Sequence, residues 1–586
     1  MQVTKRGFIS VAAASVAAAS TPALSATSTS SGPGPGGDRK ENWSRAKDLI
    51  KDNKDILASF RLRTVTMGLN LIDCIDSDLG RMKKAVNARL EEDLPVFNQA
   101  ITDVLGQLSD ELPVKGEALL QTRRAAITPI ETMLRSMVQA NGGDNTATRQ
   151  MIVDFASFVD KRVSALIVPP SGSGQAVFLG GAGVLADRGL SSGQQAYLAA
   201  LPDVLKNTST FNVDFTVGST QSGIYLDSVR AVAKVIREVG KADMDYTRAM
   251  APNPEDPSTW KITDAQMAGY QTSKKSILSA HPNARVYPYF TSLARMAVFV
   301  NAPQENPFMA GGFAGLSAPA RSISVGVNGA GVIEKAILAA PSNSINEVLQ
   351  SVKHYAGIMY EVAERVRFEV IARMNEKNVH VEEAAGVVDL SVAATNDRDA
   401  SGKPTNSVAS TLAALGVQAG CYGSVAAVGM LIDAIKKAGS ARATYAGGLS
   451  GTFIPISEDA GMADAAAAGW LTYPRYLSMT AVCSVGTDMF FAAWPSNVSD
   501  ETFEAQVAGM LLDEMAIGVY TNKTTSSRII PVPYEHDPNL WVVIMGGGGL
   551  LGNGPVMDMQ FATLPPPALF VGRSGALPAP LTSFRN

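Results

Sequence analysis

The sequence predicts an α/β protein that folds as a single large domain. Short apolar runs rich in β-branched residues lead into glycine-rich turns, and a helical pattern follows many of these turns. This order recurs along the whole chain, which is typical of a parallel sheet or barrel whose loops gather at the carboxyl ends of its strands. Since sites in such folds form at that edge, we expect a functional site among the glycine-rich turns.

Composition places the chain among soluble globular proteins. Of its 586 residues, 46% are apolar and 18% are charged, and the formal net charge is −4. Lys and Arg are dispersed without a basic run, so no nucleic-acid partner is expected. Three cysteines are too few for a disulfide framework, and the four histidines lie far apart, so no metal site is assigned. The sequence indicates no particular cofactor and leaves a homo-oligomer open.

Residues 1–26 are predicted to be an export signal. Lys5-Arg6 precede a weakly apolar run that is too short to span a bilayer, and small residues follow. The segment TKRGFI resembles a twin-arginine signal with Lys in place of the first Arg, which leaves the general secretory route open. Residues 27–43 are rich in Ser, Gly and Pro and are expected to form a disordered tether. The mature protein, without a membrane span, is therefore expected in the periplasm or outside the cell.

Residues 44–586 are expected to form the folded domain, because no linker divides them. Ser44 is a suitable N-cap for the first helix. Helical periodicity predicts helices near residues 44–59, 79–108, 228–239, 332–339, 345–375, 411–415, 425–438 and 500–517. Short apolar runs that end in turn residues predict strands near residues 61–69, 124–128, 177–183, 211–217, 297–300, 323–327, 385–390 and 542–545. Residues 251–289 are rich in Pro, Ser, Lys and Tyr, and are expected to form a surface insertion.

A loop of Gly and Ser follows the predicted strand at residues 211–217 and precedes a helix. Backbone N–H groups at a helix N-terminus can bind an anion, although this loop lacks both the Lys of a P-loop and the GxGxxG of a dinucleotide site. A simple tight turn is the alternative. The candidate substrate-binding residues in this loop are Gly218, Ser219, Thr220 and Ser222.

The stretch at residues 447–462 is GGLSGTFIPISEDAGM. A surface linker would not carry its apolar centre, and a core strand would not carry Glu458 and Asp459, so we expect a loop held close to a ligand. Ser450 is a candidate substrate contact. Glu458 and Asp459 could act as general acid and base, could bind a divalent cation, or could cap their own loop. Because adjacent side chains point in different directions, at most one of the two is expected at the site.

Two later stretches, AVCSVGTDM and KTTSSRIIP, add further candidates. Cys483 could be a nucleophile if a cation such as Lys523 or Arg528 lowers the pKa of its thiol; packing in the core is the alternative. Asp488 follows an apolar run and is a further catalytic candidate. Arg528 ends a run of hydroxyl side chains and suits a bidentate grip on a carboxylate or phosphate, with an internal ion pair as the alternative.

Several motifs together resemble an uncharacterised bacterial and archaeal family named "PFL family protein" (domain of unknown function 711). The motifs are RTVTMGLNLIDC, GSTQSGI, NPFMAGGFAG, VGVNGAGV, GVVDLSVA, GGLSGTFIPISEDAGM, AVCSVGTDM, KTTSSRIIP and GLLGNGPVM, and the resemblance runs from about residue 45 to the C-terminal end. It implies a fold like that of pyruvate formate-lyase and other glycyl-radical enzymes, an α/β barrel of parallel strands with a site in its interior. Asn306, in the third motif, is a further candidate substrate contact. The resemblance brings no known reaction.

The chain departs from the family pattern in three places. These are the export signal, the insertion at residues 251–289, and GCYG at residues 420–423, where relatives tend to have a Gly-Thr-His-Gly type of stretch. Tyr422 therefore puts any catalytic histidine at that position in doubt. A glycyl-radical enzyme also needs an Arg-Val-Ser-Gly-Tyr-like loop, for which Gly575 is only a weak analogue, so radical chemistry is a minor alternative.

The leading hypothesis is an exported, non-radical enzyme that acts on a small carboxylate or phosphate inside the barrel. The Gly218–Gly223 loop and Arg528 would hold the anion, while Glu458 or Asp459 would move protons. The competing hypothesis is an exported protein that binds or senses a small molecule without chemistry. An isolated carboxylate or thiol with a shifted pKa in the pocket would favour the enzyme.

Overall fold

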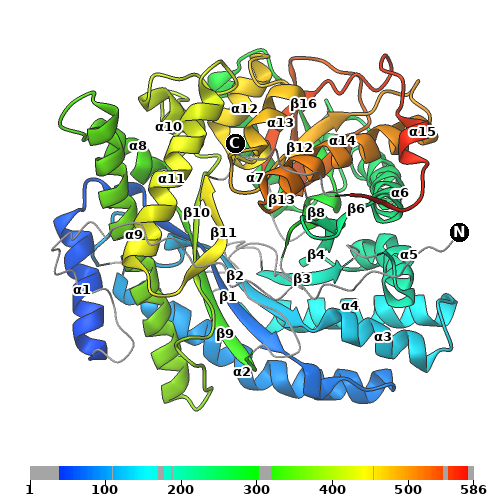
Figure 1. Ribbon diagram of the computed structural model, residues 1–586, viewed down its shortest axis with the longest axis horizontal. Coiled ribbons are helices and arrows are strands. Elements are labelled where there is room, and N and C mark those ends of the chain that lie inside the picture. Colours follow the sequence, from blue (N-terminus) through cyan, green and yellow to red (C-terminus); the bar gives the residue numbers. More distant parts are fainter. Residues whose placement is uncertain are drawn as a thin grey trace, which may run out of the picture.

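A nine-stranded sheet runs through the middle of the computed structural model, and helices surround it (Figure 1). The structure describes residues 38–108, 110–168, 177–185, 189–302, 319–452, 454–545 and 552–578, with residues 177–185 described as backbone only. The strand order is β11-β10-β9-β1-β2-β3-β4-β8-β13. The strands are β1 (Arg61–Asn70), β2 (Leu120–Thr128), β3 (Val177–Leu185), β4 (Phe211–Thr216), β8 (Met296–Val300), β9 (Arg321–Asn328), β10 (Val388–Ala393), β11 (Ala446–Thr452) and β13 (Thr525–Ser527).

Most neighbours in this sheet are parallel. Strands β1, β2, β3, β4 and β8 run in one direction, and β9, β10 and β11 run in the other. The two groups meet at the antiparallel pair of β1 and β9, and β13 is antiparallel to β8. The prediction of an α/β protein with mostly parallel strands is confirmed.

A second, five-stranded sheet follows directly from the edge of the first. Its order is β14-β12-β16-β15-β7, and a single residue, Arg528, separates β13 from β14. Its strands are β7 (Arg285–Phe290), β12 (Phe490–Ala493), β14 (Ile529–Val532), β15 (Leu540–Met545) and β16 (Asn553–Met557). A small third sheet contains β5 (Gly218–Ser219), β6 (Gly223–Tyr225) and β17 (Ala576–Leu577). Arg528 thus lies at the junction of the two large sheets.

Fifteen α-helices lie within the described residues. They are α1 (Arg39–Asp52), α2 (Leu79–Leu108), α3 (Ile130–Ala140), α4 (Thr146–Leu166), α5 (Ser192–Asn207), α6 (Leu226–Met250), α7 (Asp264–Ala280), α8 (Ala330–Leu338), α9 (Ile345–Glu376), α10 (Val408–Ala414), α11 (Ser424–Arg442), α12 (Ala460–Ala467), α13 (Tyr473–Thr480), α14 (Asp500–Thr521) and α15 (Ala568–Val571). No helix in these ranges is both long and apolar enough to cross a bilayer.

Side chains alternate along the strands between an apolar face and a polar face. On β1, Val65 and Met67 join the main hydrophobic core, which the helices share, whereas Thr64 and Thr66 lie on the opposite face because successive strand residues point to opposite sides. We call this second face the inner face. Its buried polar residues include Thr64, Thr66, Thr122, Arg124, Asn212, Asp214, Thr216, Ser322, Ser324, Asn328, Asp389 and Ser391. A buried face this polar is not built for packing alone.

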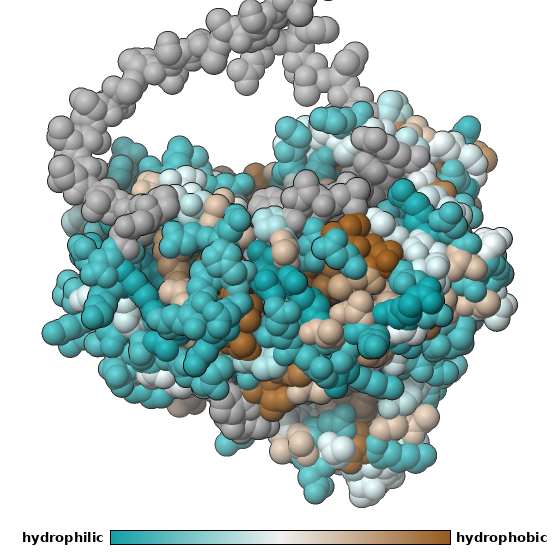
Figure 2. Space-filling model, turned by 90° about the horizontal axis from the view of Figure 1, so that it is seen from below, coloured by the Kyte–Doolittle hydropathy of each residue, from teal (hydrophilic) through white to brown (hydrophobic). Residues whose placement is uncertain are grey.

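One face of the outer surface is mostly polar as well (Figure 2). The face seen from below in Figure 2 is mostly hydrophilic, with separate hydrophobic patches near its centre. This distribution agrees with the dispersed charges of the sequence.

The expected surface insertion at residues 251–289 is folded into the domain. Helix α7 lies within it, strand β7 begins within it and ends one residue beyond it, and β7 pairs in parallel with β15. The side chain of Tyr270 is fully buried and donates a hydrogen bond to the backbone carbonyl of Val286. The irregular pattern concealed a helix, because α7 buries only Tyr270 and Ile277 and so shows little apolar periodicity.

Candidate functional site

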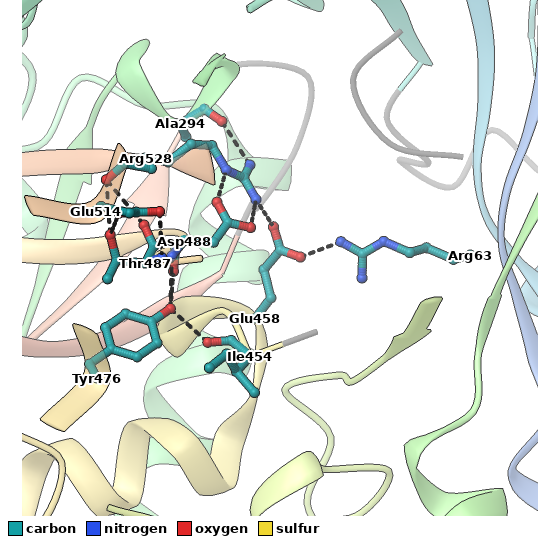
Figure 3. A network of polar contacts seen from close by, with 10 residues as sticks. Arg63, Ala294, Ile454, Glu458, Tyr476, Thr487, Asp488, Glu514 and Arg528 are labelled. Carbon is teal, nitrogen blue, oxygen red and sulfur yellow. Dashed lines mark hydrogen bonds and ion pairs between the residues drawn. The ribbon is translucent and has the colours of Figure 1, made fainter. Parts of the chain in front are cut away.

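Three sequence candidates meet at the junction of the two large sheets. Glu458 ends a short 3-10 turn (Ile456–Glu458), Asp488 precedes β12, and Arg528 links β13 to β14. The Arg528 guanidinium donates two hydrogen bonds to Asp488, with Nη2 lying 2.7 Å from Oδ2, and Nη2 also lies 3.2 Å from Oε1 of Glu458 (Figure 3). Its Nη1 donates to the carbonyl of Ala294 over 3.1 Å. Bidentate arginine–carboxylate pairs of this kind are strong and hold both groups in one orientation.

Arg63 binds the Glu458 carboxylate from the side opposite Arg528. Its Nη2 donates to Oε2 of Glu458, so Glu458 bridges Arg63 of the first sheet and Arg528 (Figure 3). Opposite β9, Leu62 pairs with Val327 and Thr64 with Gly326, which leaves Arg63 as the extra residue of a β-bulge. Bulges re-aim side chains and occur next to active sites. Sequence reasoning missed Arg63 because a bulge leaves no mark in the apolar pattern of the strand.

A third arginine belongs to this group. Arg124 lies on the inner face of β2 and is 2% exposed. Burial lowers its pKa to about 9, and repulsion by Arg63 and Arg528 adds to that effect, while Glu458 opposes it. The three guanidinium groups are therefore close enough to affect one another. We call Arg63, Arg124, Arg528, Glu458 and Asp488 the arginine cluster.

Opposing effects set the charge of Glu458. Burial raises its pKa, but the ion pairs with Arg63 and Arg528 outweigh burial and leave the pKa below its usual value. Glu458 is consequently a carboxylate at neutral pH. A carboxylate that is paired on both sides is a weak base, so any proton transfer by Glu458 requires a change in its partners.

Unlike its neighbour Glu458, Asp459 binds backbone groups at two helix ends. Its Oδ1 accepts from the backbone N–H groups of Gly461 (2.9 Å) and Met462 (3.1 Å), and so caps α12. Its Oδ2 accepts from the N–H of Val408 at the start of α10 (2.7 Å), and the hydroxyl of Ser407 donates to Oδ1. Burial raises its pKa to about 6. The catalytic hypothesis for Asp459 is replaced by a structural one, since its carboxylate joins two helix ends.

Cys483 lies in the hydrophobic core, with 2% of its surface exposed. Burial raises the pKa of its thiol, and the opposing effect of nearby Lys523 is smaller. The Lys523 ammonium donates a 2.7 Å hydrogen bond to the carbonyl of Thr480. The expected cation is present, but the thiol stays protonated at neutral pH, and a thiol is a poor nucleophile.

The loop at Gly218–Gly223 is a hairpin between β5 and β6. The N–H of Thr220 donates to the side chain of Asn301, and that of Ser222 donates over 3.0 Å to the hydroxyl of Ser219. These donors are thus satisfied within the protein, which corrects the expected anion loop to the tight-turn alternative. Of the remaining candidates, Asn306 lies outside the described residues, and Ser450 lies in β11 with its side chain not described.

Glu514, on α14, is a buried carboxyl that sequence reasoning missed. It is fully buried and accepts hydrogen bonds from the backbone N–H (3.1 Å) and the hydroxyl of Thr487, the residue before Asp488 (Figure 3). Burial raises its pKa to about 8. A Cβ on Gly486 would lie 2.0 Å from the Glu514 carboxylate, so the glycine of the motif VGTD makes room for this contact. Glu514 therefore supports the backbone that presents Asp488 to Arg528.

Two further features bear on the chemistry. Among the described residues, no group of three or more His, Cys, Asp or Glu side chains is placed to hold a metal ion. Gly575, the weak analogue of a radical glycine, is exposed, and its carbonyl accepts from the N–H of Leu226.

Comparison with known proteins gives both relatives and structural neighbours. The family model described as "Uncharacterised ACR (DUF711)" matches residues 57–537. The chain is 32% identical over 545 residues to the UPF0210 protein of Ligilactobacillus salivarius, covering 92% of this chain and 98% of the relative. It is 31% identical over 544 residues to the UPF0210 protein of Methanocaldococcus jannaschii, covering 92% of this chain and 100% of the relative.

Solved structures of anaerobic ribonucleotide reductases are also similar to the chain. One has a TM-score of 0.40 and 8% identity, covering 87% of this chain and 79% of that chain. Another, from Thermotoga maritima in complex with dATP and CTP, has a TM-score of 0.40 and 9% identity, covering 83% and 82%.

Proposed function

The chain belongs to the DUF711 family of uncharacterised proteins, and we propose that this member binds a small carboxylate or phosphate in its interior and acts on it as an enzyme. The arginine cluster carries the proposal. Three buried guanidinium groups lie close enough to affect one another, and two of them bind the carboxylates of Glu458 and Asp488. Because guanidinium groups bind carboxylates and phosphates through paired hydrogen bonds, a small anion is the class of ligand that suits this cluster.

Glu458 indicates how such an anion would be held. Its two carboxylate oxygens contact Arg63 on one side and Arg528 on the other. A ligand carboxylate or phosphate has the same oxygen geometry and could replace Glu458 at either arginine, with Arg124 as the further cation. The 13% exposure of the Glu458 side chain is greater than the 3% exposure of Asp488, so Glu458 is the more easily displaced of the two.

Displacement would also turn Glu458 into a useful base. The ion pairs with Arg63 and Arg528 hold its pKa down against the effect of burial. If a ligand takes over these guanidinium groups, burial acts without opposition, and the pKa of Glu458 rises. A carboxylate whose pKa rises on ligand binding can accept a proton from that ligand near neutral pH. Binding and proton transfer would thus be coupled through the same two arginines.

Binding without catalysis is the second candidate. It is favoured by the pairing of both carboxylates in the cluster and by the buried, protonated thiol of Cys483. In this case Glu458 would only compete with the ligand for the arginines. Export to the periplasm or beyond remains a proposal for either function, since it rests on residues 1–26, which lie outside the described part of the chain.

Thermal unfolding in the presence of anions tests the site. Phosphate and succinate should raise the unfolding temperature of the wild-type protein, because a ligand at 100 times its Kd stabilises the folded state by about 2.7 kcal/mol. Succinamide is neutral and should leave the unfolding temperature unchanged. Arg124→Met should abolish the anion effect. Arg123→Met is the matched control, since Arg123 is equally buried on β2 but contacts Thr102 of α2 on the opposite face. An equal anion effect in both variants, or none in the wild type, would refute the site.

Solvent hydrogen exchange tests catalysis separately. Any stabilising anion is incubated with the protein in D2O and examined by NMR and mass spectrometry for deuterium uptake or conversion. Wild-type protein should change the anion, and Glu458→Gln should bind it without changing it. Binding with no change in the wild type would support the second candidate.

A further inference from the structure

Buried hydroxyl groups on the inner face form no hydrogen bond with the described protein. Thr64 and Thr66 on β1 are each 1% exposed, and Ser391 on β10 is 8% exposed. The side-chain oxygen of each is buried without a partner among the residues that the structure describes. Buried hydroxyls in folded proteins are nearly always paired, so three on one face indicate partners of another kind.

Two of these hydroxyls, those of Thr64 and Thr66, lie beside the arginine cluster. Thr64 directly follows Arg63, and Thr66 is the Cα partner of Arg124 across the β1–β2 ladder. Neighbouring strands are about 4.8 Å apart, and residues two apart along a strand are separated by about 6.6 Å. The hydroxyls and guanidinium groups therefore fall within the length of one small molecule.

Gly326 lies on β9, the strand between the two strands that bear the hydroxyls. Thr64 is its partner across the β1–β9 ladder. Ser391 lies on the far side of β9, since the next residue, Val392, pairs with Val327. Glycine has no side chain, so the inner face between Thr64 and Ser391 is not filled by the intervening strand. Thr64 and Ser391 therefore lie on the inner face on either side of Gly326.

We propose that the ligand of the arginine cluster is a hydroxylated organic anion, a sugar phosphate or a sugar acid, whose hydroxyl groups bind Thr64, Thr66 and Ser391. This inference rests on the proposed anion site and adds the chemical class of the ligand. Threonine and serine hydroxyls both donate and accept hydrogen bonds, which matches the hydroxyls of a polyol. A plain carboxylate would bind the arginines but would leave the three hydroxyls unpaired, and sites that bind a substrate hydroxyl reject analogues that lack it.

Matched ligand pairs test this class by isothermal titration calorimetry on the full chain. Glucose 6-phosphate is compared with inorganic phosphate, and gluconate with hexanoate. In at least one pair the hydroxylated member should bind at least about tenfold more tightly than the plain one. The pair that shows this difference identifies the ligand as a sugar phosphate or as a sugar acid. This wild-type comparison does not depend on any variant being folded.

Isosteric variants then connect the preference to the hydroxyls. Thr66→Val and Ser391→Ala should each lower the affinity for the preferred hydroxylated ligand about tenfold and leave the affinity for the plain anion unchanged. Thr272→Val, at an exposed position of α7, is the control. Equal affinities for hydroxylated and plain anions would overturn this inference while the anion site stands. Binding of no anion at all would overturn both.

Discussion

Substitution of Glu514 by Gln should weaken the pH dependence of stability. Glu514 is fully buried on α14, and burial raises its pKa from 4.5 to about 8. The folded protein therefore keeps this proton over a pH range in which the unfolded chain has lost it. Because a group with a raised pKa in the folded state stabilises the protein only while protonated, stability falls as the pH rises from 4.5 through 8.

The two pKa values set the size of the effect. Between pH 6 and pH 8, this single group accounts for a loss of about 2 kcal/mol in the free energy of unfolding. Glutamine has the shape of the protonated acid and can still accept the hydrogen bond from the N–H of Thr487. Glu514→Gln should therefore remove this part of the loss without leaving a cavity.

Urea unfolding of both proteins at pH 6 and pH 8 measures the effect. The change in unfolding free energy between the two pH values should be about 2 kcal/mol smaller in Glu514→Gln than in the wild type. Taking the difference between variants cancels the other titrating groups, including Asp459. Glu501→Gln, at the exposed start of the same helix, should keep the wild-type dependence. The same pH dependence in wild type and Glu514→Gln would refute the assignment of a buried, protonated Glu514.

Three further predictions concern residues outside the arginine cluster. Asp459→Ala removes the acceptor that joins α10 and α12 and should lower the urea-unfolding free energy by about 3 kcal/mol, whereas an unchanged value would contradict its capping role. Gly223→Ala places a Cβ 2.0 Å from the carbonyl oxygen of Leu577 at a positive φ and should cost about 2 kcal/mol or more in the same assay; wild-type stability would exclude that contact. In native protein at pH 7.5, iodoacetamide followed by mass spectrometry should find exposed Cys421 modified and buried Cys483 protected, and rapid modification of Cys483 would show that its thiol is accessible.

Regular elements were predictable because their patterns are local. The long helix at residues 79–108 shows its apolar period throughout, and α2 has those bounds. The strand at residues 61–69 is rich in β-branched residues, and β1 differs from it by a single residue. Helix α7 was not predicted because only Tyr270 and Ile277 of this helix are buried, so its sequence shows little apolar periodicity.

The site was predictable only in part, because its geometry depends on distant segments. Asp488 was expected from its place after an apolar run and Arg528 from its place after a run of hydroxyl side chains, and the structure brings them together. The sequence could not separate Glu458 from Asp459, since only the fold shows that one faces the arginines while the other meets the start of α10. Arg63 depends on a register shift against β9, which no local pattern reveals.

The most direct test of the interior anion site is a crystal structure of the wild-type protein grown in phosphate. An ion should lie among Arg63, Arg124 and Arg528, and the carboxylate of Glu458 should have moved away from at least one of the two arginines that it bridges here. Glu458 still bridging Arg63 and Arg528, with no ion beside them at a phosphate concentration that saturates the protein in solution, would contradict the proposed site.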